Sequence, residues 1–345
     1  MWNLWKEPYH DLEAQGMYKP RQSQYMSRMR THIFSLLLAL SMSVVAIHFY
    51  IKAARLSQEF EDQIGSRLIN IDTVTHDVIV KPIHSHNDEW RRHPLVDALK
   101  VGANSVEADC FYFPNDPDTI YVGHNTAFLN KERNVDSLYL DHLYDMLERA
   151  NAKNDTSRKN GIFYTSPETT TYFYIDIKTK GEELLEALNK KVERFLARGY
   201  LTTYDSEKDE IREGPLTIII TGNYPYNYIS SQKLRYAFID APLKDLVDPE
   251  KARLYPAGKI SIFSSASLSE LTGSHKARSL FSGLSTHQLA DIEKYISAAH
   301  KVGLKTRIWD TPKFTKSIKH TVWKQIIALG SDYLNADELK EAVSI

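Results

Sequence analysis

The sequence predicts an α/β fold, a (β/α)8 barrel over residues 76–345, with one membrane-spanning helix before it. Short runs rich in β-branched and aromatic residues alternate with longer segments of helical periodicity, which is the pattern of a parallel sheet covered by helices. Eight runs are present, and eight parallel strands close a barrel. The runs are 76–84, 104–113, 171–178, 216–223, 236–241, 259–266, 304–310 and 331–337.

Four helical segments between these runs end in glycine, as helix C-termini often do. They are HPLVDALKVG, EELLEALNKKVERFLARG, LADIEKYISAAHKVG and SIKHTVWKQIIALG. A doubly wound sheet is the main alternative, but it usually has a glycine-rich phosphate loop after its first strand. The residues that follow the first run here are SHND, and residues 127–170 are expected to form an insertion before the third strand.

Residues 33–51, IFSLLLALSMSVVAIHFYI, contain no Asp, Glu, Lys or Arg. In a helix this stretch is about 28 Å long, close to the thickness of a bilayer's hydrocarbon core. We expect a single-pass transmembrane helix and not a cleaved signal peptide, because a long polar segment precedes the apolar one.

The charges around this span predict its orientation. Basic residues are more numerous before it than after it, so the positive-inside rule predicts a cytoplasmic tail at 1–32. Residues 52–75 would then be a stalk that carries a lumenal or extracytoplasmic barrel, where the glycosylation sequon at Asn154 would be exposed. The basic residues concerned are Lys19, Arg21, Arg28 and Arg30 before the span, and Lys52 and Arg55 after it.

Composition excludes several classes of protein. The chain has 43 Lys+Arg and 44 Asp+Glu, so no basic excess indicates a nucleic-acid partner. Cys110 is the only cysteine, so neither an intrachain disulfide nor a thiolate metal cluster can form.

Polar side chains collect where the predicted strands end, and barrels carry their active sites at the C-terminal ends of their strands. Glu107 and Asp109 are two residues apart and share one face of a strand, as do Asp176 and Lys178. The segment TIYVGHN adds His124 beside the second strand. Other strand ends carry His84, Ser85, His86, Asn87, Asp88, Asn223, Trp309, Asp310, Asn335 and Asp337.

Each of these residues alone is more often an ordinary surface or ion-pair residue, but their convergence predicts a site. The carboxylates of Glu107, Asp109 and Asp176 would repel one another in one pocket unless a cation lay between them. Oxygen ligands without cysteine select Mg²⁺ or Ca²⁺.

Two histidines complete the predicted chemistry. His84 and His124 would act as general acid and base, since histidine titrates near neutral pH. Lys178 would add positive charge beside the cation. A divalent cation, a lysine and two histidines suit the cleavage of a phosphodiester.

Four segments, HSHNDEWRRHPLVDALKVGANSVEADCF, YVGHN, YFYIDIKTK and KTRIWDTP, together resemble the fungal altered inheritance of mitochondria protein 6 family. That family lies within the phospholipase-C-like or glycerophosphodiester phosphodiesterase superfamily of barrels. GANSVEAD and DIKT are also similar to segments of spider-venom sphingomyelinase D. The resemblance runs from Lys81 to the C-terminus.

The resemblance implies a role for each matching residue. His84 and His124 match the catalytic histidines, and the metal-binding acids, which hold Mg²⁺ or Ca²⁺ in relatives, match Glu107, Asp109 and Asp176. The positions expected to bind substrate are Asn87, Lys178 and Trp309.

The chain also departs from the glycerophosphodiesterase pattern. Those enzymes have Arg-Gly directly after the first histidine, where this chain has Ser85 and His86, and they usually have Glu in place of Asp176. The resemblance gives His86 no role, and we expect it to position Asp88 or Glu107.

The expected function is a membrane-anchored, metal-dependent phosphoric diester hydrolase that acts on a phospholipid or glycerophosphodiester, by hydrolysis or through a cyclic phosphate. The alternative is a catalytically silent barrel that serves as a lipid-binding or scaffolding membrane protein. The two histidines argue against this alternative, because a binding protein has no need of two proton-transfer groups. A mitochondrial location follows only from the family's name, and transit peptides tend to avoid acidic residues such as Glu7, Asp11 and Glu13.

Overall fold

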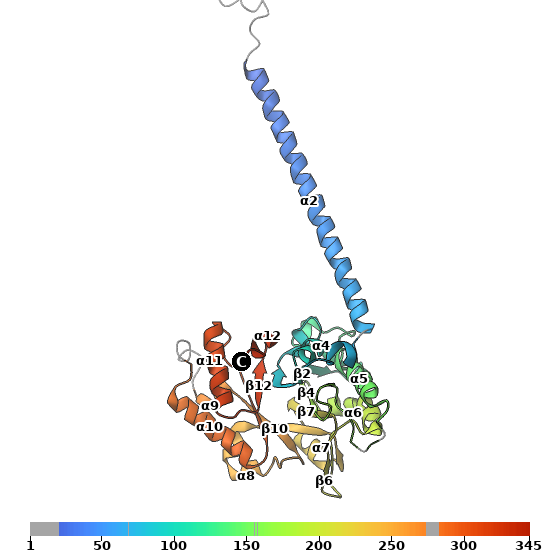
Figure 1. The fold of residues 1–345 in the computed structure, drawn as a ribbon, viewed down its shortest axis with the longest axis vertical. Coiled ribbons are helices and arrows are strands. Elements are labelled where there is room, and N and C mark those ends of the chain that lie inside the picture. The colour runs from blue at the N-terminus through green and yellow to red at the C-terminus, as the bar shows by residue number, and fades with distance from the viewer. Residues whose placement is uncertain (1–20, 68, 155, 157, 274–282) are drawn as a thin grey trace, which may run out of the picture. The chain divides into compact units, whose positions relative to one another are not determined.

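The computed structural model describes residues 21–67, 69–154, 156, 158–273 and 283–345, and the chain divides into two units (Figure 1). The first unit ends at Leu68, and the second, Ile69–Ile345, contains the barrel. Residues 1–20 of the expected cytoplasmic tail lie outside the described residues.

The first unit contains α2, Arg21–Arg67, a single helix of 47 residues. Its stretch Arg28–Arg55 has a mean hydropathy of 2.0 and is long and apolar enough to cross a membrane. The large apolar side chains from Ile33 to Ile51 are exposed, whereas a helix in a soluble core would bury one face. The helix includes the predicted span and continues through most of the residues predicted to form a stalk.

The barrel unit begins earlier than residue 76, where we expected the stalk to end. The short helix α3, Ile71–Val74, buries Ile71 and Val74 in the core of the barrel unit. The hydroxyl of Thr75 donates to the carbonyl oxygen of Ile162. The last part of the expected stalk is therefore part of the folded barrel.

Eight parallel strands pair in a closed ring, because β1 pairs with both β2 and β12. This confirms the predicted (β/α)8 barrel, and each of the eight predicted runs overlaps one strand of the ring. In ring order the strands are β1 Lys81–Ser85, β2 Ala103–Tyr112, β4 Thr171–Ile177, β7 Leu216–Gly222, β9 Ala237–Pro242, β10 Ser261–Ser267, β11 Lys305–Trp309 and β12 Tyr333–Ala336.

The first strand begins at Lys81 and not at His76. The chain before it passes close to Gly102, which has a φ of +89°. A Cβ atom at that position would lie 2.1 Å from the carbonyl oxygen of Ile79. Glycine is therefore required where β2 begins.

Other strands lie outside the ring. β3, Ile120–Val122, pairs antiparallel with β2 and carries His124 just beyond its end. A small three-stranded sheet contains β5 Thr203–Asp205, β6 Glu210–Arg212 and β8 Leu234–Arg235.

Helices follow the ring strands, and the four segments predicted from their terminal glycines are helical. They are α4 Val96–Lys100, α6 Gly181–Arg198, α10 Thr286–Lys301 and α11 Lys316–Ala328. Further helices in this unit are α5 Asp141–Asn151, α7 Tyr226–Ser231, α8 Pro249–Ala252, α9 Leu268–Thr272 and α12 Leu339–Ala342. Short 3-10 turns and one π-turn are η1 Asp88–Trp90, η2 Thr126–Phe128, η3 Asp136–Leu140 and η4 Leu243–Val247.

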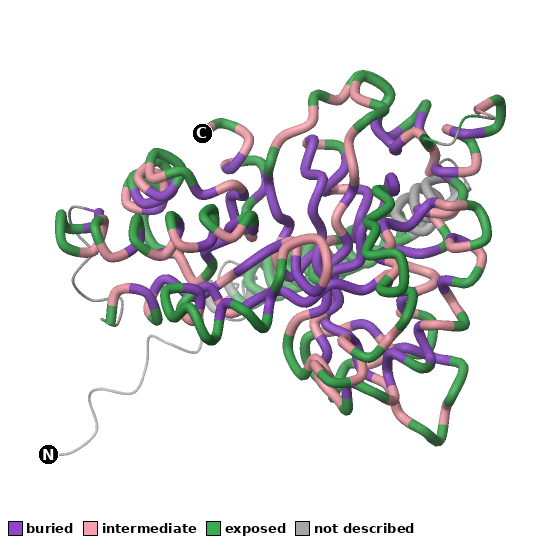
Figure 2. Tube along the Cα trace, turned by 90° about the horizontal axis from the view of Figure 1, so that it is seen from below, coloured by how far each residue is buried: buried purple, intermediate pink, exposed green. Residues whose placement is uncertain are grey.

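The barrel has two apolar cores, and its buried strands lie at the centre of the unit (Figure 2). The larger core lies between the strands and the helices and includes Ile175, Ile220 and Ile239. A smaller, mostly aromatic cluster combines residues from the other face of the ring strands with Tyr204 from β5, since neighbouring side chains on a strand point to opposite faces. Its members are Tyr174, Tyr204, Ile219, Phe238, Phe263 and Tyr333.

Candidate active site

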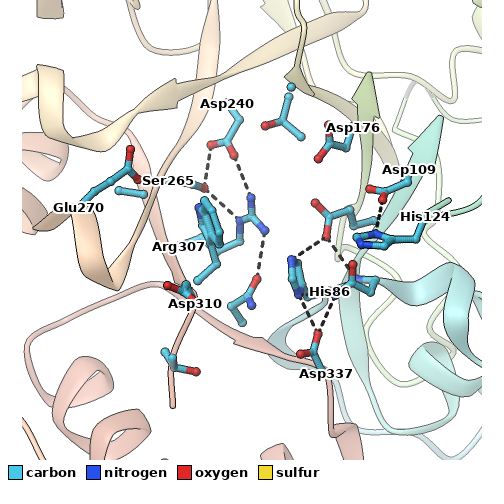
Figure 3. Close-up of a pocket in the computed structure, with 18 of the residues that line it drawn as sticks. His86, Asp109, His124, Asp176, Asp240, Ser265, Glu270, Arg307, Asp310 and Asp337 are labelled. Carbon is cyan, nitrogen blue, oxygen red and sulfur yellow. Dashed lines mark hydrogen bonds and ion pairs between the residues drawn. The ribbon is translucent and has the colours of Figure 1, made fainter. Parts of the chain in front are cut away.

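A cavity of about 570 Å³ lies at the C-terminal ends of the ring strands (Figure 3). Acidic residues outnumber basic ones among those that line it, with eight Asp or Glu and four Lys or Arg. An anionic substrate would be repelled by this lining unless further positive charge were bound. The acids are Glu107, Asp109, Asp176, Asp240, Glu270, Asp310, Asp337 and Glu338, and the bases are Lys178, Arg307, Lys313 and Lys319.

The floor of the cavity is built around Arg307, which lies on β11 and is almost completely buried. Its guanidinium donates to the carboxylate of Asp240 at 3.1 Å, to Ser265 Oγ at 3.0 Å and to Asn335 Oδ1 at 3.0 Å. It also lies over the ring of Tyr174, 4.8 Å from the centroid. This network places a fixed cation directly above the aromatic interior of the barrel.

His84 supports this floor through Arg307 without lining the cavity itself. Its side chain is fully buried, and Arg307 Nη1 donates to its Nε2 at 2.9 Å. Its Nδ1 must then carry the proton, which is donated to Ser105 Oγ at 2.8 Å. Burial and the charge of Arg307 lower the pKa of His84 to about 3, so the ring is neutral and both of its nitrogens are occupied.

His86 lies two residues after His84, closer to the cavity, and its side chain lines the cavity wall. Its Nδ1 is 2.7 Å from Asp337 Oδ1, and its Nε2 is 3.7 Å from Glu107 Oε2. Lys313 Nζ contacts the other oxygen of Asp337 at 3.0 Å. Burial would raise the pKa of Asp337, but His86 and Lys313 hold it well below its usual range, so this carboxylate is ionised.

The loop that carries His86 is anchored by Asp88, which is fully buried. Its carboxylate accepts hydrogen bonds from Ser85 Oγ, the backbone N–H of Leu95 and Arg91 Nε. Asn87 has a φ of +47°, a left-handed conformation that asparagine tolerates better than most residues. Its backbone N–H donates to Glu107 at 3.3 Å, and its amide donates to Asp337 at 3.1 Å.

Glu107 extends from β2 beneath these groups and is buried. Burial alone would raise its pKa, but His84, His86 and Arg307 around it hold the pKa well below its usual range. Glu107 is therefore an ionised carboxylate inside the protein, adjacent to the cavity.

The second predicted histidine, His124, also lines the cavity, next to Asp109. Its Nδ1 is 2.8 Å from Asp109 Oδ2, and its side chain is 53% exposed. The ring of Trp90 meets it edge-on, with 4.8 Å between the centroids. Each of the two cavity histidines thus has an aspartate on Nδ1, which leaves Nε2 as the nitrogen available for chemistry.

Lys178 lies between two of the predicted metal-binding acids. Its Nζ is 2.7 Å from Asp176 Oδ2 and 3.1 Å from Asp109 Oδ1. Burial would lower the pKa of Lys178, but these carboxylates raise it to about 12. The second oxygen of Asp176 is buried without a hydrogen-bond partner.

Glu89 was not predicted as a site residue. Its carboxylate is buried beside Asp109, and neither of its oxygens has a hydrogen-bond partner. Burial and the charge of Asp109 raise the pKa of Glu89 to about 8. Among the described residues, Glu89, Asp109 and His124 form a group whose potential ligand atoms all lie within 4.8 Å of one another.

The structure brings seven of the eight predicted site residues to one cavity. They are Asn87, Glu107, Asp109, His124, Asp176, Lys178 and Trp309, whereas His84 does not line the cavity. The residues missed by sequence reasoning are His86 as a cavity group, Glu89, Asp240 and Arg307. Arg307 could have been found, because it lies two residues before Trp309 on a strand and must share its inward face.

Comparisons with known proteins identify relatives of this chain. Residues 72–240 match the AIM6-like phosphodiesterase domain. Altered inheritance of mitochondria protein 6 of Saccharomyces cerevisiae (strain YJM789) is 38% identical over 291 residues, which cover 80% of this chain and 73% of the relative. No solved structure matches the chain.

Two further relatives carry the same name. The Lachancea thermotolerans protein is 36% identical over 301 residues, covering 80% of this chain and 68% of the relative. The Candida glabrata protein is 35% identical over 303 residues, covering 78% and 72%. The similarity to spider-venom sphingomyelinase D stays a prediction.

Proposed function

Since the chain belongs to the altered inheritance of mitochondria protein 6 family, we propose that it is a phosphoric diester hydrolase that acts on a phospholipid or glycerophosphodiester. One observation carries the proposal. Two histidines that follow different strands, His86 after β1 and His124 after β3, line one cavity, and each is fixed by an aspartate at 2.7–2.8 Å. Such a pair can remove a proton from a nucleophile and donate one to a leaving oxygen.

We assign to His86 the acid/base role that was predicted for His84. A proton-transfer group must reach the substrate and must have a free nitrogen, and His84 has neither property. His84 would instead hold Arg307 and Ser105 in place beneath the site. The expectation that His86 only positions Asp88 or Glu107 is replaced by a direct role.

The proposed cation would be held by Glu107, Asp109 and Asp176, with Mg²⁺ or Ca²⁺ as the candidates. All three acids line the cavity, its lining has an acidic excess, and Asp176 offers a buried oxygen without a partner. Lys178, which contacts two of these acids, would have to turn towards the substrate when the cation binds. A bound cation would offset charge on the phosphate oxygens.

The protein's own groups account for the proton transfers. One histidine takes the proton of the nucleophile, which is either water or a hydroxyl group of the substrate. As the phosphorus–oxygen bond to the leaving group breaks, the other histidine donates a proton to that oxygen. Attack by water gives a phosphomonoester and an alcohol, and attack by a substrate hydroxyl gives a cyclic phosphate. Lys178 and Arg307 would stabilise the anionic phosphate from the wall and the floor.

The remaining cavity residues would recognise the substrate. Asn87 lies beside His86, and Trp309, which is 37% exposed, offers an apolar surface at the end of β11. Together with Trp90 it could contact an apolar part of a lipid-derived substrate.

We further propose that α2 is a single-pass anchor, with the tail in the cytoplasm and the barrel on the opposite side of the membrane. The apolar stretch in α2 and the flanking basic residues support it. Protease added outside sealed vesicles tests this orientation. In vesicles whose cytoplasmic face points outward, the protease is expected to cleave only residues 1–32. Digestion of the barrel in such vesicles would contradict the proposed orientation.

The activity test uses the full-length protein in detergent micelles and phosphorus-31 NMR. The substrates are glycerophosphodiesters, lysophospholipids and sphingomyelin. Each is incubated with the wild type, with His86→Gln and with His124→Gln, once in the presence of Mg²⁺ or Ca²⁺ and once in the presence of a chelator. We expect the wild type to turn over at least one diester, and we expect each substitution and the chelator to abolish that turnover. The product, a phosphomonoester or a cyclic phosphate, distinguishes hydrolysis from cyclisation. A folded protein that turns over none of these diesters would favour the lipid-binding scaffold.

A further inference from the structure

Glu89 has a carboxylate that the proposed hydrolysis does not use. It lies in η1, directly after the loop that carries His86, and is 4% exposed. Neither carboxylate oxygen has a hydrogen-bond partner. A buried ionised carboxylate without a partner is strongly unfavourable, so such a group normally binds a proton or a cation.

The acids around Glu89 differ from it in this respect. Asp88 has Arg91, Glu107 has His84 and His86 close by, and Asp109 has Lys178 and His124. Glu89 is thus the acid of this group that lacks a compensating partner in the described part of the chain.

Its position points to a specific ligand set. One oxygen of Glu89, one oxygen of Asp109 and one ring nitrogen of His124 lie within 4.8 Å of one another. Ligand atoms around a tetrahedral cation with bonds of 2.0–2.2 Å are about 3.4 Å apart, so a shift of roughly 1 Å would close the site. The half-exposed side chain of His124 can make such a movement.

We propose that Glu89, Asp109 and His124 form a second cation site, which takes a transition metal of the Zn²⁺ or Mn²⁺ class. Two carboxylates and an imidazole are a mixed oxygen and nitrogen donor set, which such metals accept and which Ca²⁺ and Mg²⁺ disfavour. Glu89 distinguishes this site from the one formed by Glu107, Asp109 and Asp176. Asp109 would belong to both sites.

The second site has a consequence for turnover, and this consequence rests on the proposed function. A metal on His124 competes with the proton that His124 must donate or accept. Zn²⁺ at this site would therefore inhibit the hydrolase, and loss of the Glu89 carboxylate would relieve the inhibition.

The decisive measurement is metal binding without substrate. Tag-free, full-length protein in detergent is freed of metal and titrated with Zn²⁺ in a calorimeter, and with Co²⁺ by visible absorption. Wild type is expected to bind one Zn²⁺ at this site and to show a Co²⁺ band. Glu89→Gln and His124→Gln are each expected to weaken the Zn²⁺ affinity at least tenfold.

Asp176→Asn is the matched control, because it removes one carboxylate from the other proposed site. It should keep Zn²⁺ binding and lose Mg²⁺ binding, and Glu89→Gln should do the reverse. Thermal unfolding without metal checks the fold, and Glu89→Gln should be at least as stable as wild type. Unchanged Zn²⁺ affinity in folded Glu89→Gln, or no Zn²⁺ binding by wild type, would overturn the proposal.

The two proposals fail in different ways. If no diester is turned over while Zn²⁺ binding still depends on Glu89, the proposed function fails and the metal site stands. If turnover depends on His86 while Zn²⁺ binding does not depend on Glu89, the metal site fails and the proposed function stands.

Discussion

His84 and His86 lie two residues apart at the end of one strand, yet the barrel gives them different surroundings. His84 is fully buried in the floor, with Arg307 on one nitrogen and Ser105 on the other. His86 is partly exposed on the cavity wall, with Asp337 on Nδ1. Depth along the barrel axis, and not residue type, therefore separates the buried His84 from His86, to which we assign the proton transfer.

The same contrast extends to the two basic residues of the site. Arg307 in the floor has several protein partners and is 3% exposed. Lys178 on the wall is partly exposed, and its Nζ forms ion pairs with Asp109 and Asp176, two acids of the proposed metal site. Floor residues should therefore affect mainly stability, and wall residues should affect mainly turnover.

The largest effect is expected for the floor. Arg307→Met leaves Asp240 buried without its cation, and breaking a buried ion pair in this way typically costs about 3–5 kcal/mol. Denaturant unfolding of the solubilised protein measures this loss. The double variant Arg307→Met/Asp240→Asn should recover part of it, and equal loss in both variants would show that the pair is not coupled.

The wall is tested by His86→Gln. Turnover should fall by about 10²- to 10⁴-fold, the usual contribution of a general acid or base. The free energy of unfolding should change by no more than about 1 kcal/mol, because the side chain is partly solvated. His84→Gln is the matched comparison, and a larger loss of turnover there than in His86→Gln would restore the original assignment.

A smaller effect is expected for Asp337, which acts through His86. Asp337→Asn should lower kcat by about tenfold to a hundredfold, less than loss of the histidine itself, with KM nearly unchanged. Asp337→Glu should restore part of kcat, since it keeps the charge. A change confined to KM would instead assign Asp337 to substrate binding.

The smallest change per measured step is expected in the pH dependence of stability. The pKa of His84 is about 3 in the folded protein and near 6.5 when unfolded, so the unfolded chain binds more protons between these values. This position therefore lowers the free energy of unfolding by about 1.4 kcal/mol for each pH unit of acidification between the two pKa values. The slope of stability against pH should be shallower in His84→Gln, and identical slopes would contradict a neutral, buried His84.

The sequence was sufficient to predict the barrel because parallel strands covered on both faces are continuous apolar runs. It was sufficient for most of the wall because residues at strand ends, such as Asp109 and Asp176, must meet at one rim. The sequence could not show how deep along the barrel axis each side chain lies. Nothing in HSHND shows that the strand ends at Ser85 and leaves His84 inside the ring.

Other features depended on a contact between distant segments or on an unusual backbone conformation. Asp240 is an ordinary strand residue until Arg307 is placed beside it. The position of Glu89 depends on the left-handed backbone of Asn87, which turns the chain into η1. Neither the Asp240–Arg307 contact nor the conformation of Asn87 is indicated by a local pattern in the sequence.

The second histidine comes from a part of the molecule that the ring does not need. β3 pairs with β2 through three residue pairs and takes no part in closing the barrel. The distance between His124 and Asp109 is set by this short hairpin, with the backbone N–H of Gly123 bonded to the carbonyl oxygen of Asp109 at 3.1 Å. A change in the hairpin could therefore move His124 away from Asp109 while the ring of eight strands stays closed.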